Sequence, residues 1–257
     1  MKLFRIIMTG AGVMAIASFY LSCTKTNFER VADANTDYNN KSLVQVYNAS
    51  INTQRTFFYA DGNKLNGAAL IYTQTTATNA AHTGSGLTFI LDPGLHSFLI
   101  RDTLLTSVQT PISFSGNLDA NKFYTVFTYD TMNASKQKSV LADLVIPTDS
   151  TARLRFANFV YWKSGIPPPM DIFSKRLNAN IFSNINYTDV TGFIPYASMV
   201  SDSLIVRTAG TMIALDTLAV SSFTPKRSYT LVFRGRYVTN EIGGALFPRT
   251  LASYANN

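Results

Sequence analysis

The sequence predicts an all-β protein made of two tandem β-sandwich domains that follow an N-terminal export segment. Three observations support this prediction: apolar residues alternate along short runs, turn residues separate those runs, and several segments recur 105 to 112 residues apart. The chain has 257 residues, of which 46% are hydrophobic and 12% aromatic, so it can fill real hydrophobic cores. Because a single domain most often has about 100 to 150 residues, this length fits two domains.

The first 22 residues have the features of a secretory signal. Lys2 and Arg5 precede an uncharged apolar stretch of about 15 residues, and roughly 20 are needed to span a bilayer. Tyr20-Leu21-Ser22-Cys23 then resembles the bacterial lipoprotein signal, although Leu is preferred where Tyr20 stands. The resemblance implies that residues 1–22 form a lipoprotein signal peptide and that Cys23 is lipidated. An ordinary signal peptide with an incidental cysteine and an uncleaved anchor are the alternatives.

The residues after the cysteine predict how the chain is attached. Residues 23–41 contain Asn, Asp, Thr and Lys with few large apolar groups, so we expect a flexible tether that connects the lipid in the membrane to the first domain. The residue that follows Cys23 is Thr24 and not Asp. By resemblance to the sorting signals of bacterial lipoproteins, this favours the outer membrane. The sequence leaves open whether the protein faces the periplasm or the cell surface.

An internal repeat organises the rest of the chain. Five short segments recur in the same order, which predicts two copies of one domain over residues 42–146 and 151–257. Pro147-Thr148-Asp149-Ser150 joins the copies. The matched pairs are residues 44–48 with 154–158, 64–66 with 176–178, 97–101 with 203–207, 124–127 with 229–232, and 141–142 with 251–252.

The periodicity within each copy is that of β-strands. Phe98 and Ile100, like Leu204 and Val206, alternate with other residues, so one set faces a core. Asp92-Pro93-Gly94 and similar turn segments separate such runs. Many short strands with turns about ten residues apart, in domains of about 100 residues, predict β-sandwiches.

Two tyrosines favour an immunoglobulin-like topology. Tyr124 lies six residues after Leu118, Tyr229 lies six residues after Phe223, and each tyrosine begins an apolar run. This spacing resembles the tyrosine corner, in which a tyrosine hydroxyl bonds back to the backbone at a sandwich corner. The alternative is a tyrosine selected only for its strand propensity.

The second copy also resembles a known family. It contains Leu154-Arg155-Phe156-Ala157-Asn158, then Pro167-Pro168-Pro169, then Met170-Asp171-Ile172-Phe173. This order is similar to that of the domain of unknown function 4397, found singly or in tandem in secreted and lipid-anchored proteins of Bacteroidota and other bacteria. The first copy departs from the pattern at residues 53–58, where Pro and Asp are missing. The resemblance implies a β-sandwich in the cell envelope and brings no catalytic residues.

The sequence offers few groups for catalysis, which needs a convergent acid, base or nucleophile. Its two histidines, His82 and His96, are not spaced as a metal pair and have no counterparts in the second copy. One cysteine and two histidines also argue against a zinc cluster. We therefore predict a non-catalytic protein without a metal or cofactor. A hydrolase or accessory enzyme of polysaccharide use and a spacer without a ligand are the alternatives.

Charge and aromatic residues suggest where a ligand binds. Residues 151–257 hold 11 basic and 5 acidic side chains, and Arg153/Arg155 and Arg234/Arg236 each alternate along one strand. If those strands are neighbours, the four arginines form one patch for acidic glycan, lipopolysaccharide phosphate or an envelope protein, with a solvated sheet face as the alternative. We expect no nucleic-acid partner outside the cytoplasm.

Two further sets of residues are candidates for contact or modification. Tyr161 and Trp162 precede a Pro-rich segment and are candidates for stacking on a sugar ring or anchoring a protein, with burial against the adjoining domain as the alternative. Asp followed by Ser or Thr resembles the short O-glycosylation acceptor of Bacteroidota envelope proteins. The candidate acceptors are Thr103, Thr131, Ser150, Ser203 and Thr217.

Overall fold

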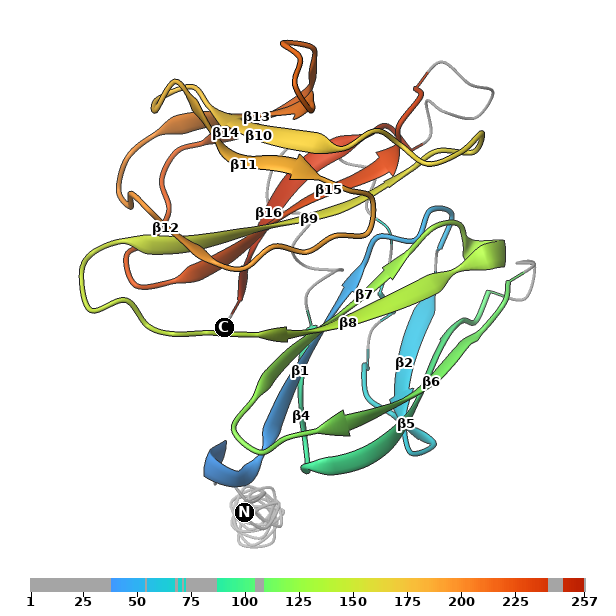
Figure 1. Ribbon diagram of the computed structural model, residues 1–257. Helices are drawn as coiled ribbons and strands as arrows, with labels where there is room; N and C mark the ends of the chain where they lie inside the picture. Colours follow the sequence, from blue (N-terminus) through green and yellow to red (C-terminus); the bar gives the residue numbers. More distant parts are fainter. Residues whose placement is uncertain are drawn as a thin grey trace, which may run out of the picture. The chain divides into compact units, whose positions relative to one another are not determined.

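The computed structural model describes residues 38–53, 55–67, 69–70, 72, 87–104, 109–239 and 247–256. Residues 38–257 form one compact unit. Apart from two single-turn 3-10 helices, η1 (Tyr38–Asn40) and η2 (Met132–Ala134), the regular structure of its described residues consists of strands, which confirms the all-β prediction (Figure 1). Within the described residues, no helix is long and apolar enough to span a bilayer.

The strands of the described residues fall into two successive sets of eight. The first set is β1 (Ser42–Asn48), β2 (Thr56–Ala60), β3 (Asn63–Lys64), β4 (Leu87–Leu91), β5 (Gly94–Asp102), β6 (Ile112–Leu118), β7 (Phe123–Tyr129) and β8 (Lys136–Ala142). The second set is β9 (Ala152–Tyr161), β10 (Met170–Ser174), β11 (Ala179–Ile185), β12 (Ile194–Tyr196), β13 (Asp202–Thr208), β14 (Ala214–Val220), β15 (Ser228–Arg236) and β16 (Thr250–Asn256).

Both sets have the same sheet topology. The first set forms the sheets β4-β1-β7-β8 and β3-β2-β5-β6, and adding eight to every strand number gives the sheets of the second set. The central pairs β1/β7 and β9/β15 are parallel. This strand order differs from the constant-type immunoglobulin order, in which the first two strands are neighbours, because β1 and β2 lie in different sheets.

The register shows which of the repeated segments are equivalent. Val44 pairs with Tyr124 and Leu154 with Tyr229, so β1/β7 and β9/β15 correspond as the sequence match predicts. Two of the five matches are wrong in detail. Lys64 lies on β3, whereas residues 176–178 lie in the turn before β11. Tyr124 pairs with Leu141, but Tyr229 pairs with Ala255, so residues 141–142 and 251–252 are not equivalent.

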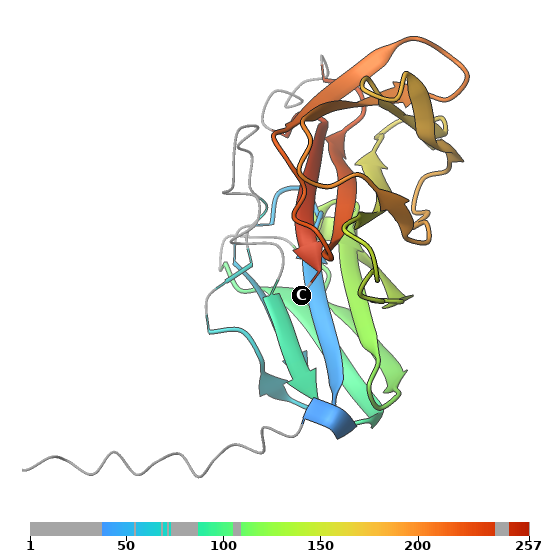
Figure 2. The same cartoon turned by 90° about the vertical axis from the view of Figure 1, so that its left-hand side faces the viewer.

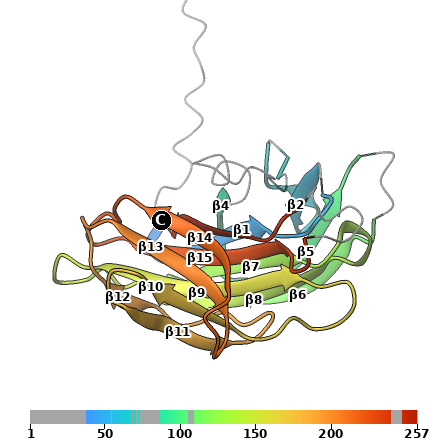
Figure 3. The ribbon, with the colours of Figure 1, turned by 90° about the horizontal axis from the view of Figure 1, so that it is seen from above.

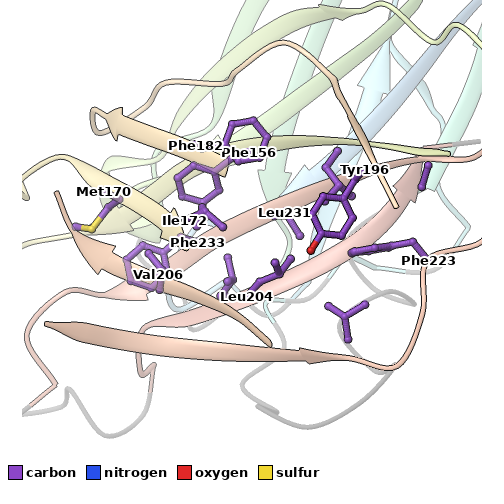
Figure 4. Close-up of a cluster of buried hydrophobic side chains, with 14 of the residues drawn as sticks. Phe156, Met170, Ile172, Phe182, Tyr196, Leu204, Val206, Phe223, Leu231 and Phe233 are labelled. Carbon is purple, nitrogen blue, oxygen red and sulfur yellow. The ribbon is translucent and has the colours of Figure 1, made fainter. Parts of the chain in front are cut away.

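Each pair of sheets encloses its own hydrophobic core. In the first sandwich, Val44 and Val46 of β1 pack with Phe58 of β2 and Ile100 of β5. The second core is larger and joins β9 and β15 to β10 and β13 (Figure 4). Its members include Phe156, Met170, Ile172, Phe182, Tyr196, Leu204, Val206, Phe223, Leu231 and Phe233.

A third apolar cluster joins the two sandwiches through the outer faces of the sheets β4-β1-β7-β8 and β12-β9-β15-β16. Phe127 of β7 packs on Phe159 of β9 with ring centroids 4.8 Å apart, and Tyr47 of β1 stacks on Tyr254 of β16 at 4.9 Å. β9 and β15 lie beside β7 and β8 in Figure 3. Figure 2 shows β16, in red, reaching β1, in blue, where Asn256 Nδ2 donates to the Oε1 atom of Gln45 at 2.9 Å.

The phenylalanine at the centre of this interface provides a test of its contribution. Phe159→Ala is expected to lower the free energy of unfolding by about 3–5 kcal/mol, because the truncation leaves a cavity among packed rings. Chemical denaturation monitored by circular dichroism measures the loss. Ile166→Ala, at a side chain that is 78% exposed, is the control and is expected to change stability by about 0.5 kcal/mol or less. Equal stabilities of the two variants would contradict the packing described.

Candidate functional site

The predicted arginine patch is wrong as an exposed surface. β9 and β15 are neighbours, but Arg155 lies opposite Thr230 while Arg234 lies opposite Phe159, four residues further along both strands. Arg155 and Arg234 are only 2% and 1% exposed, because the first sandwich covers this face of the sheet. Two of the four arginines predicted to contact a ligand are therefore unavailable to it.

Arg155 and Arg234 instead connect the two sandwiches. Arg155 donates from Nε to Thr230 Oγ1 at 2.8 Å within its own sheet, and from Nη2 to Thr125 Oγ1 at 2.7 Å in the first sandwich. Arg234 Nε donates to the hydroxyl of Tyr47 at 3.0 Å. Burial lowers the pKa of the Arg155 guanidinium, although an arginine keeps its charge at neutral pH.

The outer members of the two pairs lie at opposite ends of the sheet. Arg153 is half-buried beside the linker, where Nη1 donates to the carbonyls of Asp143 at 2.9 Å and Val145 at 3.3 Å. Arg236 is half-buried near the other end of β15 and pairs in register with Tyr161. The four arginines therefore do not form one binding surface.

A different basic surface lies between the sandwiches, which we call the corner groove. It has a volume of about 560 Å³, within the size range of ligand sites, and both sandwiches contribute to it. Four cationic side chains line it, and among its described lining residues none is acidic. The cations are Lys41, Lys122, Lys226 and Arg227, and the apolar lining consists of Leu43, Phe123, Leu144, Val145 and Ile146.

Equivalent turns of the two sandwiches place the cations. Asn121 and Lys226 occupy the same position in the turns before β7 and β15, and both have a φ of 61°. Asn121 donates its backbone N–H to Lys41 O at 2.9 Å, and Lys226 donates to Thr151 O at 2.8 Å. Asparagine tolerates this left-handed conformation, whereas for lysine it costs about 1–2 kcal/mol. The structure therefore holds Lys226 in a strained conformation at the groove.

The two predicted corner tyrosines lock these turns, and their hydrogen bonds confirm the tyrosine corner. The backbone N–H of Asp119 donates to the Tyr124 hydroxyl at 3.0 Å, and the N–H of Thr224 donates to the Tyr229 hydroxyl at 3.0 Å. Each tyrosine lies two residues after a groove cation. The groove is thus built from a local motif that is present in both sandwiches.

Two ion pairs lie at the Lys41 edge of the groove. Lys41 contacts the carboxylate of Asp92, and this hydrogen bond holds the pKa of Asp92 below its ordinary value. His96 faces acceptors on both sides, with Nδ1 2.6 Å from Asp61 Oδ2 and Nε2 2.7 Å from the Asp92 carbonyl. Partial burial of the ring lowers the pKa of His96, but the bonds to Asp61 and Asp92 outweigh it and raise the pKa overall.

The predicted aromatic loop is partly shielded. Trp162 and Tyr161 are both half-buried, and the Trp162 ring packs on Tyr237 with centroids 5.7 Å apart. Ile166, further along the loop, is 78% exposed. Because β9 rises about 3.3 Å per residue, this loop lies roughly 30 Å along the strand from the groove.

The remaining candidates are distributed over both sandwiches or lie outside the described residues. Ser150 and Thr217 are exposed, whereas Thr103, Thr131 and Ser203 are half-buried, so their O-glycosylation stays a prediction. Cys23 and His82 lie outside the described residues. The described residues contain no group of three His, Cys, Asp or Glu side chains that could hold a metal ion.

No family model and no curated protein match the chain, so the resemblance to the domain of unknown function 4397 stays a prediction. A crystal structure of CBMbc, of family CBM26, from Eubacterium rectale Amy13K in complex with maltoheptaose aligns with 84% of this chain and 97% of that chain, at 14% identity and a TM-score of 0.26. A likeness at this TM-score carries no functional argument.

The corner tyrosines can be tested by removing one hydroxyl at a time. Tyr124→Phe and Tyr229→Phe are each expected to lower the free energy of unfolding by about 0.5–1.5 kcal/mol, because a backbone N–H loses its acceptor. Chemical denaturation measures the change. Tyr59→Phe is the matched control on β2 and should cost less, since the bond that its hydroxyl accepts from Arg101 is long, at 3.4 Å. A neutral effect of both corner variants would show that these bonds do not hold the turns.

The raised pKa of His96 predicts a pH dependence of stability. Its contribution is complete below the unfolded pKa of about 6.5 and is lost as the pH rises through the higher folded value. Wild type is therefore expected to exceed His96→Gln in free energy of unfolding at about pH 5.5, with a smaller difference at about pH 9. Denaturation at both values measures the difference, and a difference that does not shrink would contradict this assignment.

Proposed function

We propose that this chain is a non-catalytic, lipid-anchored protein of the cell envelope whose corner groove binds the anionic groups of envelope glycans and glycolipids. The observation that carries the proposal is the set of four cations around a groove of about 560 Å³, with no acidic side chain among its described lining residues. Cations gathered at a recess raise the local concentration of anions and orient their approach. The lipid would be carried by Cys23, in an outer-membrane lipoprotein.

The rigidity of the groove supports a binding role. Its two basic turns are held by tyrosine corners, and the sandwiches that carry them are fixed to each other by Arg155 and the aromatic interface. A site that is formed before the ligand arrives loses little conformational entropy on binding. The apolar wall adds a surface for the C–H faces of a sugar ring or for the adjoining part of a glycolipid.

The carboxylates near the groove are engaged in structural contacts, which favours binding over catalysis. Asp92 is paired with Lys41, and Asp143 lies 3.7 Å from Arg153. Glycoside hydrolysis needs two carboxyl groups about 5–9.5 Å apart on either side of the scissile bond. The described lining of the groove contains no carboxylate and does not supply such a pair.

The buried carboxylate of Asp202, away from the groove, also has a structural environment. Asp202 accepts hydrogen bonds from the hydroxyls of Ser174 and Tyr196 and from the backbone N–H groups of Arg176 and Ser203. Although burial raises its pKa, these bonds outweigh that effect and lower the pKa overall. An aspartate held by four donors stays ionised and is poorly suited to act as a general acid.

Binding to an acidic and a neutral polysaccharide tests the proposal. The acylated protein is expected to bind polygalacturonate and not dextran, and to bind more weakly as the salt concentration rises. Lys122→Ser/Arg227→Ser should weaken binding about tenfold, because two exposed charge contacts are removed. Biolayer interferometry with immobilised polysaccharide gives the affinities.

The control for this experiment has the same net charge as the groove variant. Lys163→Ser/Lys175→Ser removes two exposed cations of the second sandwich that do not line the groove. It should bind polygalacturonate as wild type does. Equal losses in the two double variants would mean that net charge rather than the groove binds the polymer, and the proposal would then fail.

A further inference from the structure

We infer that the corner groove docks on the phosphate headgroups of the bilayer that carries the N-terminal lipid, with Val145 and Ile146 entering the interfacial region. This inference rests on the proposed function, because it names the source of the anions that the groove binds. The occupant is an anionic lipid surface. Three independent features of the described residues lead to it: an exposed aliphatic pair, the cations around that pair, and the place where the chain enters the fold.

The aliphatic pair lies on the linker between β8 and β9. Val145 is 55% exposed and Ile146 is 72% exposed, and both line the groove. Two adjacent branched aliphatic side chains in water are unfavourable, and they are the kind of residue that enters the boundary between headgroups and acyl chains. Leu144, the preceding residue, is half-buried.

Hydrogen bonds hold the linker in place. Arg153 Nη1 donates to the carbonyls of Asp143 and Val145, and the Leu144 N–H donates to the Ala142 carbonyl at 3.0 Å. The chain before Ile146 is therefore fixed to both neighbouring strands. The exposure of the pair is consequently a property of the folded chain.

The surrounding cations suit an anionic membrane surface. Lys122, Lys226 and Arg227 are exposed and line the same groove as the pair. Each basic side chain near an anionic bilayer adds to the attraction, and an exposed apolar pair with a basic rim is typical of proteins that lie at a membrane interface.

The carboxylates around the groove have partners of their own, which limits their repulsion of phosphate. Asp92 is paired with Lys41 and Asp143 with Arg153. Asp119 accepts a hydrogen bond from the Tyr124 hydroxyl, and Asp149 accepts two from Thr151. These four acidic side chains of the linker and the adjoining turns are thus engaged within the protein.

The groove also lies where the chain enters the fold. Lys41 in its wall comes three residues after Tyr38, the first described residue, and 18 residues after Cys23. A segment of that length spans at most about 65 Å when fully extended. The Trp162 loop is at the other end of β9, so docking at the groove would point that loop away from the bilayer.

The test places one fluorophore on the pair. Since Cys23 is the only natural cysteine and is acylated in this proposal, Ile146→Cys supplies a unique thiol for an environment-sensitive nitrobenzoxadiazole label. The acylated protein is reconstituted in vesicles of equal parts phosphatidylethanolamine and phosphatidylglycerol. We expect the emission to shift to shorter wavelength and to be quenched by a lipid-borne nitroxide. Met212→Cys, at a side chain that is 78% exposed on the β13–β14 loop, is the control and should show neither effect.

Two comparisons make the result specific. Vesicles of phosphatidylcholine alone should reduce the shift, and Lys122→Ser/Arg227→Ser should reduce it in the anionic vesicles. Equal signals from positions 146 and 212, or an intact mass without acyl chains, would overturn the inference. If polygalacturonate still binds the groove while Ile146→Cys reports no membrane contact, the proposed function stands and the membrane inference fails. If neither binds, both fail.

Discussion

The burial of the central strands on both faces is the constraint on which the rest of the structure depends. β1 and β9 face a sandwich core on one side and the opposite sandwich on the other, so the side chains of both faces are excluded from water. The parallel pairs β1/β7 and β9/β15 are typical of strands in such surroundings. Because two sheets meet through these strands, the basic turns at their ends come together and form the corner groove.

The buried arginines show how a polar residue can complete an apolar interface. Arg155 reaches two threonine hydroxyls at equivalent positions, Thr230 in its own sheet and Thr125 in the opposite one. A buried guanidinium is tolerated only where its donors find acceptors, so these bonds restrict how the two sheets can be aligned. The aromatic rings supply the buried apolar area of the interface, and the hydrogen bonds of the arginines fix how the two sheets are aligned.

The sequence predicted the class of fold well because alternation and turn residues are local signals. It also identified the corner tyrosines, since their spacing is fixed by a local hydrogen bond. It placed Arg155 and Arg234 wrongly, because alternation along one strand shows which side chains share a face but not what covers that face. The groove cations were missed for a related reason. Lys122 and Arg227 lie at equivalent positions before the corner tyrosines, but their meeting depends on the packing of the two sheets.

The shared interface has a consequence for how many sandwiches this contact can join. Both copies use the same face, that of the sheet holding their first and last strands, and each covers the other. Such self-complementary contact resembles the isologous interface of a symmetric dimer, which closes once two subunits have met. A third copy added to this gene would find that face already occupied. This contact is therefore closed within the pair, unlike the interfaces of a solenoid, whose ends stay open to further units.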